Sequence, residues 1–312
     1  MRNFDENSIT EAVLQRFADC PDPRVKEISG ALVRHLHDFV REIQPTEEEW
    51  AYAIDFLTRA GQKCDDKRQE FILMSDVLGV SMLIDAINHP PMEAVTESTV
   101  FGPFHVNNPP KFELGDNLAG AMQGDPMYVE GTISSPGGAR LAGAEVDIWH
   151  SDGIGNYDVQ QLDKLGGFGG RGVMKTDAEG RFRFWTIRPV YYPVPTDGPV
   201  GELLRAQGRH PFRPAHLHFM LSAPGHERLV THIFAEGDKY IDSDAVFGVK
   251  DSLIRTYVLK PAGTAPDGRK MDKPYYYVDY DFVLRPLAAS RQASSARNRT
   301  DAASASISYI PK

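Results

Sequence analysis

The chain has few cysteines, no excess of basic charge and no long apolar run. Cys20 and Cys64 are the two cysteines among 312 residues, which allows at most one disulfide and no cysteine-rich metal cluster. Lysine and arginine total 34 against 43 aspartates and glutamates, and the net charge of −9 argues against nucleic-acid and anionic-membrane partners. No apolar stretch has the length of a signal peptide core or a membrane span. We therefore expect a cytoplasmic protein.

The N-terminal third is typical of helices. Two patterns that start helices, a hydroxyl residue followed three positions later by glutamate, occur at 8–11 and 46–49. The segment 68–87 is helical in length and stops before Pro90 and Pro91. Between the two start patterns, apolar residues recur at spacings of three and four: Val25, Ile28, Leu32, Leu36, Phe39 and Ile43. We predict a helical domain over residues 1–100.

The remainder changes to short runs rich in β-branched and aromatic residues, separated by glycine, proline and aspartate clusters. Such runs predict strands at 128–133, 145–150, 181–187, 216–221 and 275–284. We predict an α+β chain in which the helical domain is followed by a β-sandwich domain over residues 101–290. Residues 291–312 are too polar to bury and lack an amphipathic period, so we expect a flexible C-terminal tail.

Two histidines, His216 and His218, lie in the most strand-like run. The two-residue period of a strand points both to one side, which suits two imidazoles on one metal, although a solvated strand face explains the spacing as well. An iron(II) site of two histidines and one carboxylate needs a nearby acid, and none follows until Glu227. A zinc site needs further cysteine or histidine beside the pair, and both cysteines lie in the helical part. These two site types are disfavoured.

Two tyrosines are the next candidate donors. Tyr157 follows a predicted strand end, and Tyr192 is held extended by Pro193. A hard trivalent cation stabilises phenolate and lowers the tyrosine pKa from its usual value of about 10. Taken alone, each tyrosine is more typical of the core or of a rim than of a metal ligand.

The chain resembles the intradiol ring-cleavage dioxygenases over nearly its whole length. The motifs that carry the resemblance are residues 149–160, 192–204 and 208–219. The resemblance implies one iron(III) per subunit, with four ligands: Tyr157, Tyr192, His216 and His218. It also implies that substrate displaces Tyr192, and that Arg213 stabilises negative charge that builds on the substrate ring.

Within this family the sequence is most similar to the enzymes that cleave hydroxyquinol (1,2,4-trihydroxybenzene). Leu73 and Asp76 share one helix face, and an acidic residue at the matching position of that branch accepts a hydrogen bond from the third ring hydroxyl. The alternative is that the Asp76 carboxylate is hydrogen-bonded to other groups within the fold and has no role at the substrate. The resemblance implies further substrate-binding residues, each also compatible with ordinary packing: Val100, Phe101, Gly102, Pro103, Phe104, Val194, Pro195, Arg213 and Val246. His232 is either a hydrogen-bonding neighbour of the ligands or a core residue.

Three functions stay open at this point. The first is hydroxyquinol cleavage with dioxygen to 3-hydroxy-cis,cis-muconate, which tautomerises to maleylacetate in aromatic compound degradation. The second is catechol 1,2-dioxygenase activity, and the third is a non-catalytic β-sandwich that binds a ligand. The family resemblance also implies a homodimer formed through the N-terminal helices, with a phospholipid bound between them.

Overall fold

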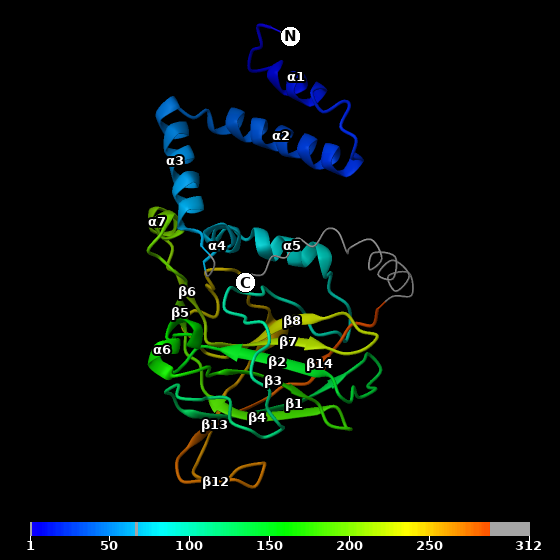
Figure 1. Ribbon diagram of the computed structural model, residues 1–312, viewed down its shortest axis with the longest axis vertical. Coiled ribbons are helices and arrows are strands. Elements are labelled where there is room, and N and C mark those ends of the chain that lie inside the picture. Colours follow the sequence, from blue (N-terminus) through cyan, green and yellow to red (C-terminus); the bar gives the residue numbers. More distant parts are fainter. Residues whose placement is uncertain (1, 66–67, 288–312) are drawn as a thin grey trace. The chain divides into compact units, whose positions relative to one another are not determined.

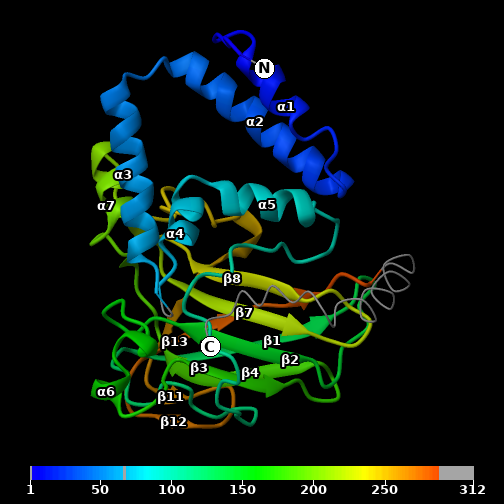
Figure 2. The same cartoon turned by 45° about the horizontal axis from the view of Figure 1, so that its top comes forward.

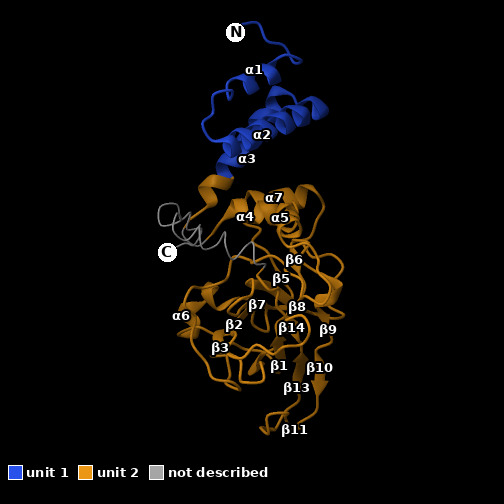
Figure 3. Cartoon of the chain, turned by 90° about the vertical axis from the view of Figure 1, so that its right-hand side faces the viewer, with its two compact units in different colours: residues 1–59 blue, residues 60–312 orange. Residues whose placement is uncertain are grey.

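The computed structural model describes residues 2–65 and 68–287. The chain divides into two compact units, residues 1–59 and residues 60–312 (Figure 3). The predicted flexible tail, residues 291–312, lies outside the described residues. The predicted border at residue 100 stays a prediction. Within the described ranges, no helix combines the length and the apolar character that a membrane span requires.

The first unit is helical, with α1 (Ile9–Gln15), α2 (Pro23–Ile43) and most of α3 (Glu47–Lys63). The start pattern at Thr46 forms a reciprocal cap, in which the Thr46 N–H donates to the Glu49 carboxylate at 2.8 Å and the Glu49 N–H donates to Thr46 Oγ1 at 3.2 Å. The pattern at Ser8 was expected to do the same and does not. The Ser8 hydroxyl donates a hydrogen bond to the Asp5 carboxylate instead, so it makes no capping hydrogen bond to the helix.

One face of α2 is apolar and exposed. The six residues predicted to form a stripe are each between 50 and 57% exposed: Val25, Ile28, Leu32, Leu36, Phe39 and Ile43. A contiguous exposed apolar surface of this kind marks an interaction site in soluble proteins.

The helix predicted over residues 68–87 is two helices, α4 (Glu70–Val77) and α5 (Val80–Asn88). The break falls at Gly79, whose φ of +74° is the left-handed conformation that glycine adopts at low cost. Reading the segment as one helix was therefore wrong at its centre. Two shorter helices, α6 (Leu162–Leu165) and α7 (Pro199–Ala206), lie in loops between strands.

Two five-stranded sheets form the body of the second unit (Figure 1). The first has the order β10-β13-β1-β14, with β4 also paired to β1: β1 (Pro126–Ser134), β4 (Arg181–Ile187), β10 (Val258–Lys260), β13 (Tyr275–Asp279) and β14 (Phe282–Val283). The second has the order β3-β2-β7-β8-β9: β2 (Glu145–His150), β3 (Arg171–Lys175), β7 (His216–Ser222), β8 (Leu229–Ala235) and β9 (Ile254–Arg255). Two small two-stranded sheets pair β5 (Tyr192–Pro193) with β6 (Phe212–Arg213), and β11 (Gly263–Thr264) with β12 (Lys270–Met271).

The main core contains residues from both sheets. Leu217, Phe219 and Leu221 of β7 pack in one cluster with Val129 of β1 and Phe184 of β4, and all five are fully buried. Burial of each such side chain contributes roughly 1.5–3 kcal/mol. Because strand residues alternate, the same β7 carries His216 and His218 on its other face, away from this cluster. The helices α4 and α5 run above β8 in the view of Figure 2. The predicted fold class is confirmed.

Gly131 marks a close contact within the first sheet. A Cβ at this position would lie 1.9 Å from the backbone oxygen of Tyr280, where the single strand predicted over 275–284 divides into β13 and β14. We expect Gly131→Ala to destabilise the protein by at least about 2 kcal/mol, because a backbone segment must shift. Gly61→Ala, in α3 with 3.7 Å to its nearest neighbour, is the control and should not lower the unfolding temperature. Equal unfolding temperatures for both variants would contradict the expectation.

Candidate metal centre

Tyr157 lies seven residues after the end of β2 and caps a short 3-10 helix, η1 (Asp158–Gln160). The next residue, Asp158, is fully buried and pairs with the equally buried Arg171, whose Nε donates to Asp158 Oδ2 at 2.6 Å. The Tyr157 N–H donates to Gln160 Oε1 at 2.8 Å. These contacts fix the loop and hold the Tyr157 ring at 0% exposure.

Tyr192 and Arg213 lie directly opposite each other in the two-stranded sheet of β5 and β6. Both side chains are buried, at 5% and 3% exposure. A two-stranded pairing of this length is weak alone, so its position depends on packing against the larger sheets. This strand pair brings together a hydroxyl and a guanidinium that are 21 residues apart in sequence.

His216 and His218 occupy the first and third positions of β7. The ring of His216 is oriented by its Nδ1, which lies 2.7 Å from the Pro214 carbonyl oxygen and donates to it. This bond places the proton on Nδ1 and leaves the lone pair on Nε2. His218 stacks on Trp149 of β2, with ring centroids 4.7 Å apart and planes inclined by 17°.

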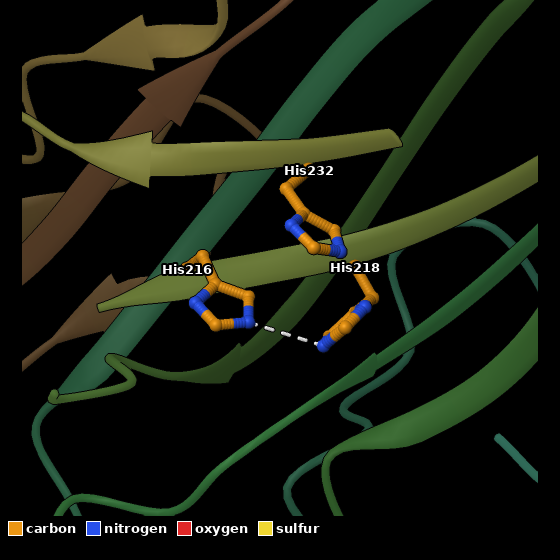
Figure 4. A group of neighbouring side chains, drawn as sticks. All are labelled: His216, His218 and His232. Carbon is orange, nitrogen blue, oxygen red and sulfur yellow. Dashed lines mark hydrogen bonds between the residues drawn. The ribbon is translucent and has the colours of Figure 1, made fainter. Parts of the chain in front are cut away.

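The donor atoms of these side chains converge. His216 Nε2 lies 3.1 Å from His218 Nε2, which lies 3.0 Å from the Tyr157 hydroxyl oxygen, which lies 3.3 Å from the Tyr192 hydroxyl oxygen (the histidine pair is dashed in Figure 4). Atoms that each lie about 2 Å from one ion are about 3 Å from one another, so the separations fit a shared metal. The four predicted ligands are thus brought together from three separate segments.

Burial keeps the donor groups of the cluster uncharged. Burial lowers the pKa of His216 and His218 well below the usual value for histidine, so both rings are neutral and offer lone pairs. Burial, reinforced by the neighbouring Tyr192, raises the pKa of Tyr157 well above its usual value. A bound metal ion would reverse this preference and stabilise the phenolate. The donor set therefore fits a hard, multiply charged ion.

His232 is a third imidazole in the same place. It is fully buried on β8 directly across from His218, and its ring stacks on His216 with centroids 4.7 Å apart (Figure 4). Of the described groups, none forms a good hydrogen bond with either of its ring nitrogens, although the Val100 backbone is near enough to affect the ring. Nitrogens of the three histidines all lie within 4.8 Å of one another. His232 therefore belongs to the site by position.

Arg213 lies beside the converging donors. Its Nη1 is 3.4 Å from His216 Nε2, and its Nε and Nη2 face the carboxylate of Asp244. Burial is the largest single influence and lowers the pKa of this guanidinium, but the charge and hydrogen bond of Asp244, together with Tyr192 and Tyr157, outweigh it in sum and the pKa lies above its usual value. A permanent positive charge thus faces the cluster.

A cavity of about 130 Å³ opens next to Tyr192 and Arg213. An engineered protein cavity of roughly 150 Å³ binds benzene, so this space suits one aromatic ring. It is lined by all but one of the predicted substrate-binding residues: Leu73, Asp76, Val100, Gly102, Pro103, Phe104, Val194, Pro195, Arg213 and Val246. Burial raises the pKa of Asp76, despite a hydrogen bond from Ser81 and the nearby charge of Arg213.

Phe101 is the exception. It is 45% exposed, lines a neighbouring cavity of about 630 Å³, and packs against His105 and Trp149 instead. The smaller cavity also has lining residues that the sequence reasoning missed: Arg68, Gln69 and Ile72. Gln69 and Ile72 precede Asp76 at spacings of seven and four, so the helical period that placed Leu73 and Asp76 could have identified them.

Gly102 connects the cavity wall to the histidines. Its φ is +75°, and a Cβ there would lie 3.1 Å from His218 Cε1. We expect Gly102→Ala to lower both the unfolding temperature and the metal content, because left-handed backbone costs about 1 kcal/mol and the methyl group presses on His218. Gly137 has a similar φ of +89°, and a Cβ there would have no atom within 4 Å. Gly137→Ala should therefore lower the unfolding temperature and leave the metal content unchanged. Full metal content in purified Gly102→Ala would contradict the expected contact.

Comparison with known proteins gives close relatives. A family model described as "Dioxygenase" matches residues 101–286, and one described as "Catechol dioxygenase N terminus" matches residues 22–96. The 6-chlorohydroxyquinol 1,2-dioxygenase of Cupriavidus pinatubonensis is 54% identical over 92% of this chain and 99% of its own length. The hydroxyquinol 1,2-dioxygenase of Rhizobium sp. is 50% identical over 90% of this chain and 96% of its own length.

Solved structures agree with these matches. The structure of hydroxyquinol 1,2-dioxygenase from Pseudomonas putida has a TM-score of 0.84 and 49% identity, covering 90% of this chain and 99% of that one. Catechol 1,2-dioxygenase from Acinetobacter radioresistens has a TM-score of 0.80 and 26% identity, covering 93% and 96%. Together with the family models, they show that this chain belongs to the intradiol ring-cleavage dioxygenases, enzymes that act with a metal cofactor.

Proposed function

We propose that this intradiol dioxygenase cleaves hydroxyquinol. Dioxygen is inserted between the two adjacent hydroxyl-bearing carbons, which gives 3-hydroxy-cis,cis-muconate and, by tautomerisation, maleylacetate. The observation that carries the proposal is a carboxylate, Asp76, in the wall of a ring-sized cavity that Tyr192 and Arg213 also line. A substrate with a third hydroxyl gives this buried carboxylate a further donor beside Ser81, whereas catechol offers none. Relatives about 50% identical that carry hydroxyquinol in their names support the same choice.

The metal is, in this proposal, iron(III), held by Tyr157, Tyr192, His216 and His218, with one ion per subunit. When bound, iron(III) is a Lewis acid that holds a catecholate through both oxygens and makes its ring carbon reactive toward dioxygen. The set of two phenols and two neutral imidazoles, with donor atoms 3.0–3.3 Å apart, supports this choice over zinc or iron(II).

The protein's own groups then bind and orient the ring. Tyr192 lines the cavity, so its oxygen meets the substrate, and in the phenolate form it would accept a proton from one of the adjacent hydroxyls and become a neutral phenol. Arg213 places a fixed positive charge beside the ring carbon where negative charge builds. Asp76 accepts a hydrogen bond from the third hydroxyl, and Phe104, which stacks on Tyr157 with centroids 4.2 Å apart, gives the cavity an aromatic wall.

An anaerobic titration tests this proposal. Hydroxyquinol added without oxygen should change the visible spectrum of the iron-loaded protein at one equivalent per subunit, and admission of air should then yield maleylacetate. Catechol, treated in the same way, should give a kcat/KM at least about tenfold lower, the discrimination that one buried hydrogen bond supplies. Equal kcat/KM values for the two substrates would identify a general catechol dioxygenase instead.

The proposal also covers the assembly of the protein, its location and its domain bounds. We infer a homodimer through the apolar stripe of α2, with a phospholipid bound between the helices, because the six residues of the stripe are about half exposed in the single chain. We also propose that the protein is cytoplasmic. Its helical domain would span residues 1–100 and its catalytic domain residues 101–290. Light scattering of the purified protein, followed by lipid extraction, tests the assembly.

A further inference from the structure

Asp244 contacts Arg213 with both carboxylate oxygens. Arg213 Nε donates to Oδ1 at 3.1 Å and Arg213 Nη2 donates to Oδ2 at 3.2 Å. The side chains of the pair are 4% and 2% exposed. Neither the sequence motifs nor the family resemblance gave this aspartate a role, and it lies 31 residues beyond its partner in the chain.

The shape of the guanidinium makes this contact directional. A guanidinium is a planar fork of five N–H donors, and a carboxylate that occupies its Nε and Nη2 edge leaves Nη1 on the opposite side. In this protein Nη1 lies 3.4 Å from His216 Nε2, and Arg213 is one of the residues that line the cavity. Asp244 therefore determines which end of the arginine faces the site.

The same carboxylate also shapes the cavity wall. Its Oδ1 accepts the Val246 N–H at 3.3 Å and its Oδ2 accepts the Gly248 N–H at 3.0 Å, while Val246 lines the cavity. Between these residues, Phe247 has a φ of +59°, an unfavourable conformation for a bulky side chain. A turn held in this conformation depends on the bonds around it, and two of them end on Asp244.

We propose that Asp244 is a positioning residue for ring cleavage, which binds the Nε and Nη2 edge of Arg213 so that Nη1 faces the substrate cavity, and which fixes the Val246 wall through the same two oxygens. The inference rests on the proposed function, because it acts through the role of Arg213 at the substrate. It adds to that function a residue that touches neither substrate nor metal and still governs the rate of the chemical step.

Asp244→Asn tests the inference directly. The amide keeps one acceptor oxygen but places an NH₂ group against a guanidinium donor, so Arg213 loses its fixed orientation. We expect kcat on hydroxyquinol to fall about 10- to 100-fold, the cost of misplacing one group by about 1 Å, while iron content and visible absorption stay at wild-type values. A variant with kcat within about twofold of wild type would overturn the proposal.

A double-mutant cycle separates positioning from general damage. If Asp244 acts through Arg213, then Asp244→Asn in an Arg213→Lys background should lower kcat by less than about twofold further. If instead the two losses multiply, Asp244 acts by another route and the proposal is wrong. Asp267→Asn is the control, since it removes a carboxylate 2.7 Å from the Trp185 indole nitrogen, in a cluster separate from the site, and should leave kcat unchanged.

Asp244→Glu keeps the test decisive where Asp244→Asn does not fold. This variant retains the charge but moves it by one methylene, so it should fold, bind iron and still lose kcat at least about tenfold. A glutamate variant with wild-type kcat would contradict the inference. If wild-type protein itself is colourless and inactive on hydroxyquinol, the proposed function fails, whereas active wild type with unimpaired Asp244 variants rejects the inference alone.

Discussion

Replacing His218 with glutamine should release the bound iron and abolish ring cleavage. His218 Nε2 is central to the donor cluster, 3.1 Å from His216 Nε2 and 3.0 Å from the Tyr157 oxygen. Replacing a residue that hydrogen-bonds to a metal ligand typically lowers metal affinity or activity 10- to 100-fold. Replacing a ligand itself should therefore lower metal affinity more than about 100-fold. Iron per subunit, measured by plasma mass spectrometry, and the visible spectrum together give the result.

His232→Gln is the matched comparison. His232 is equally buried, lies directly across from His218 on the neighbouring strand, and stacks on His216, yet it is not among the four proposed ligands. We expect this variant to keep about one iron per subunit and its colour. If His232→Gln loses iron as completely as His218→Gln does, the ion is held by three histidines and the assignment of the two tyrosines must be revised.

Replacing Asp76 with asparagine should remove the preference for hydroxyquinol. The side chain lines the ring-sized cavity, and an amide is a weaker acceptor that also presents a donor to the third hydroxyl. One charge-assisted hydrogen bond to a substrate contributes about 1.5–3 kcal/mol, which predicts a fall of about 10- to 100-fold in kcat/KM for hydroxyquinol. For catechol, kcat/KM should change less than about threefold, since that substrate has no group to pair with Asp76.

A lower stability of Asp76→Asn would not explain a lower kcat/KM for hydroxyquinol, because we expect this variant to be as stable as wild type. Burial raises the pKa of Asp76 above its value in the unfolded chain, so the charged carboxylate is disfavoured in the folded protein relative to the unfolded chain. The contribution of Asp76 to folding stability is therefore fully present at pH values below its pKa in the unfolded chain. This contribution is lost as the pH rises through its pKa in the folded protein. At pH 7, Asp76→Asn should unfold at or above the wild-type temperature, as scanning calorimetry can measure.

Asp85→Asn provides the control for substrate choice. Asp85 is a carboxylate of similar burial, with a side chain 10% exposed, that lines the larger neighbouring cavity and accepts from Lys250 at 3.3 Å. The ratio of kcat/KM for hydroxyquinol and catechol should be unchanged in this variant. A similar loss of preference in both variants would mean that overall charge, rather than the hydrogen bond from Asp76, selects the substrate.

The periodic parts of the fold were predictable from the sequence. Alternation along 216–221 predicted a strand with both histidines on one side, and the helical spacing of Leu73 and Asp76 placed both in one wall of the cavity. The break at Gly79 was missed, because a glycine within a helical pattern is ambiguous until packing decides it. The failed cap at Ser8 has a similar cause, since its hydroxyl had a competing partner in Asp5.

Convergence of distant segments was not predictable by spacing. Tyr157 and Tyr192 lie in loops, where no period fixes the direction of a side chain, and their place beside the histidines was expected from the family resemblance alone. Asp244 escaped notice for the same reason, because its partner is distant in sequence and a single aspartate in a turn carries no signal. Loop chemistry of this kind becomes visible when the sheets and hairpins bring the segments together.

The absorption spectrum of the purified, iron-loaded protein examines the ligand set most directly. Coordination of ferric iron by tyrosinate should give a broad band in the visible range and a red solution, and this band should weaken in Tyr157→Phe while the histidines remain intact. A colourless protein that nonetheless contains one ferric ion per subunit would show that neither phenol binds the metal.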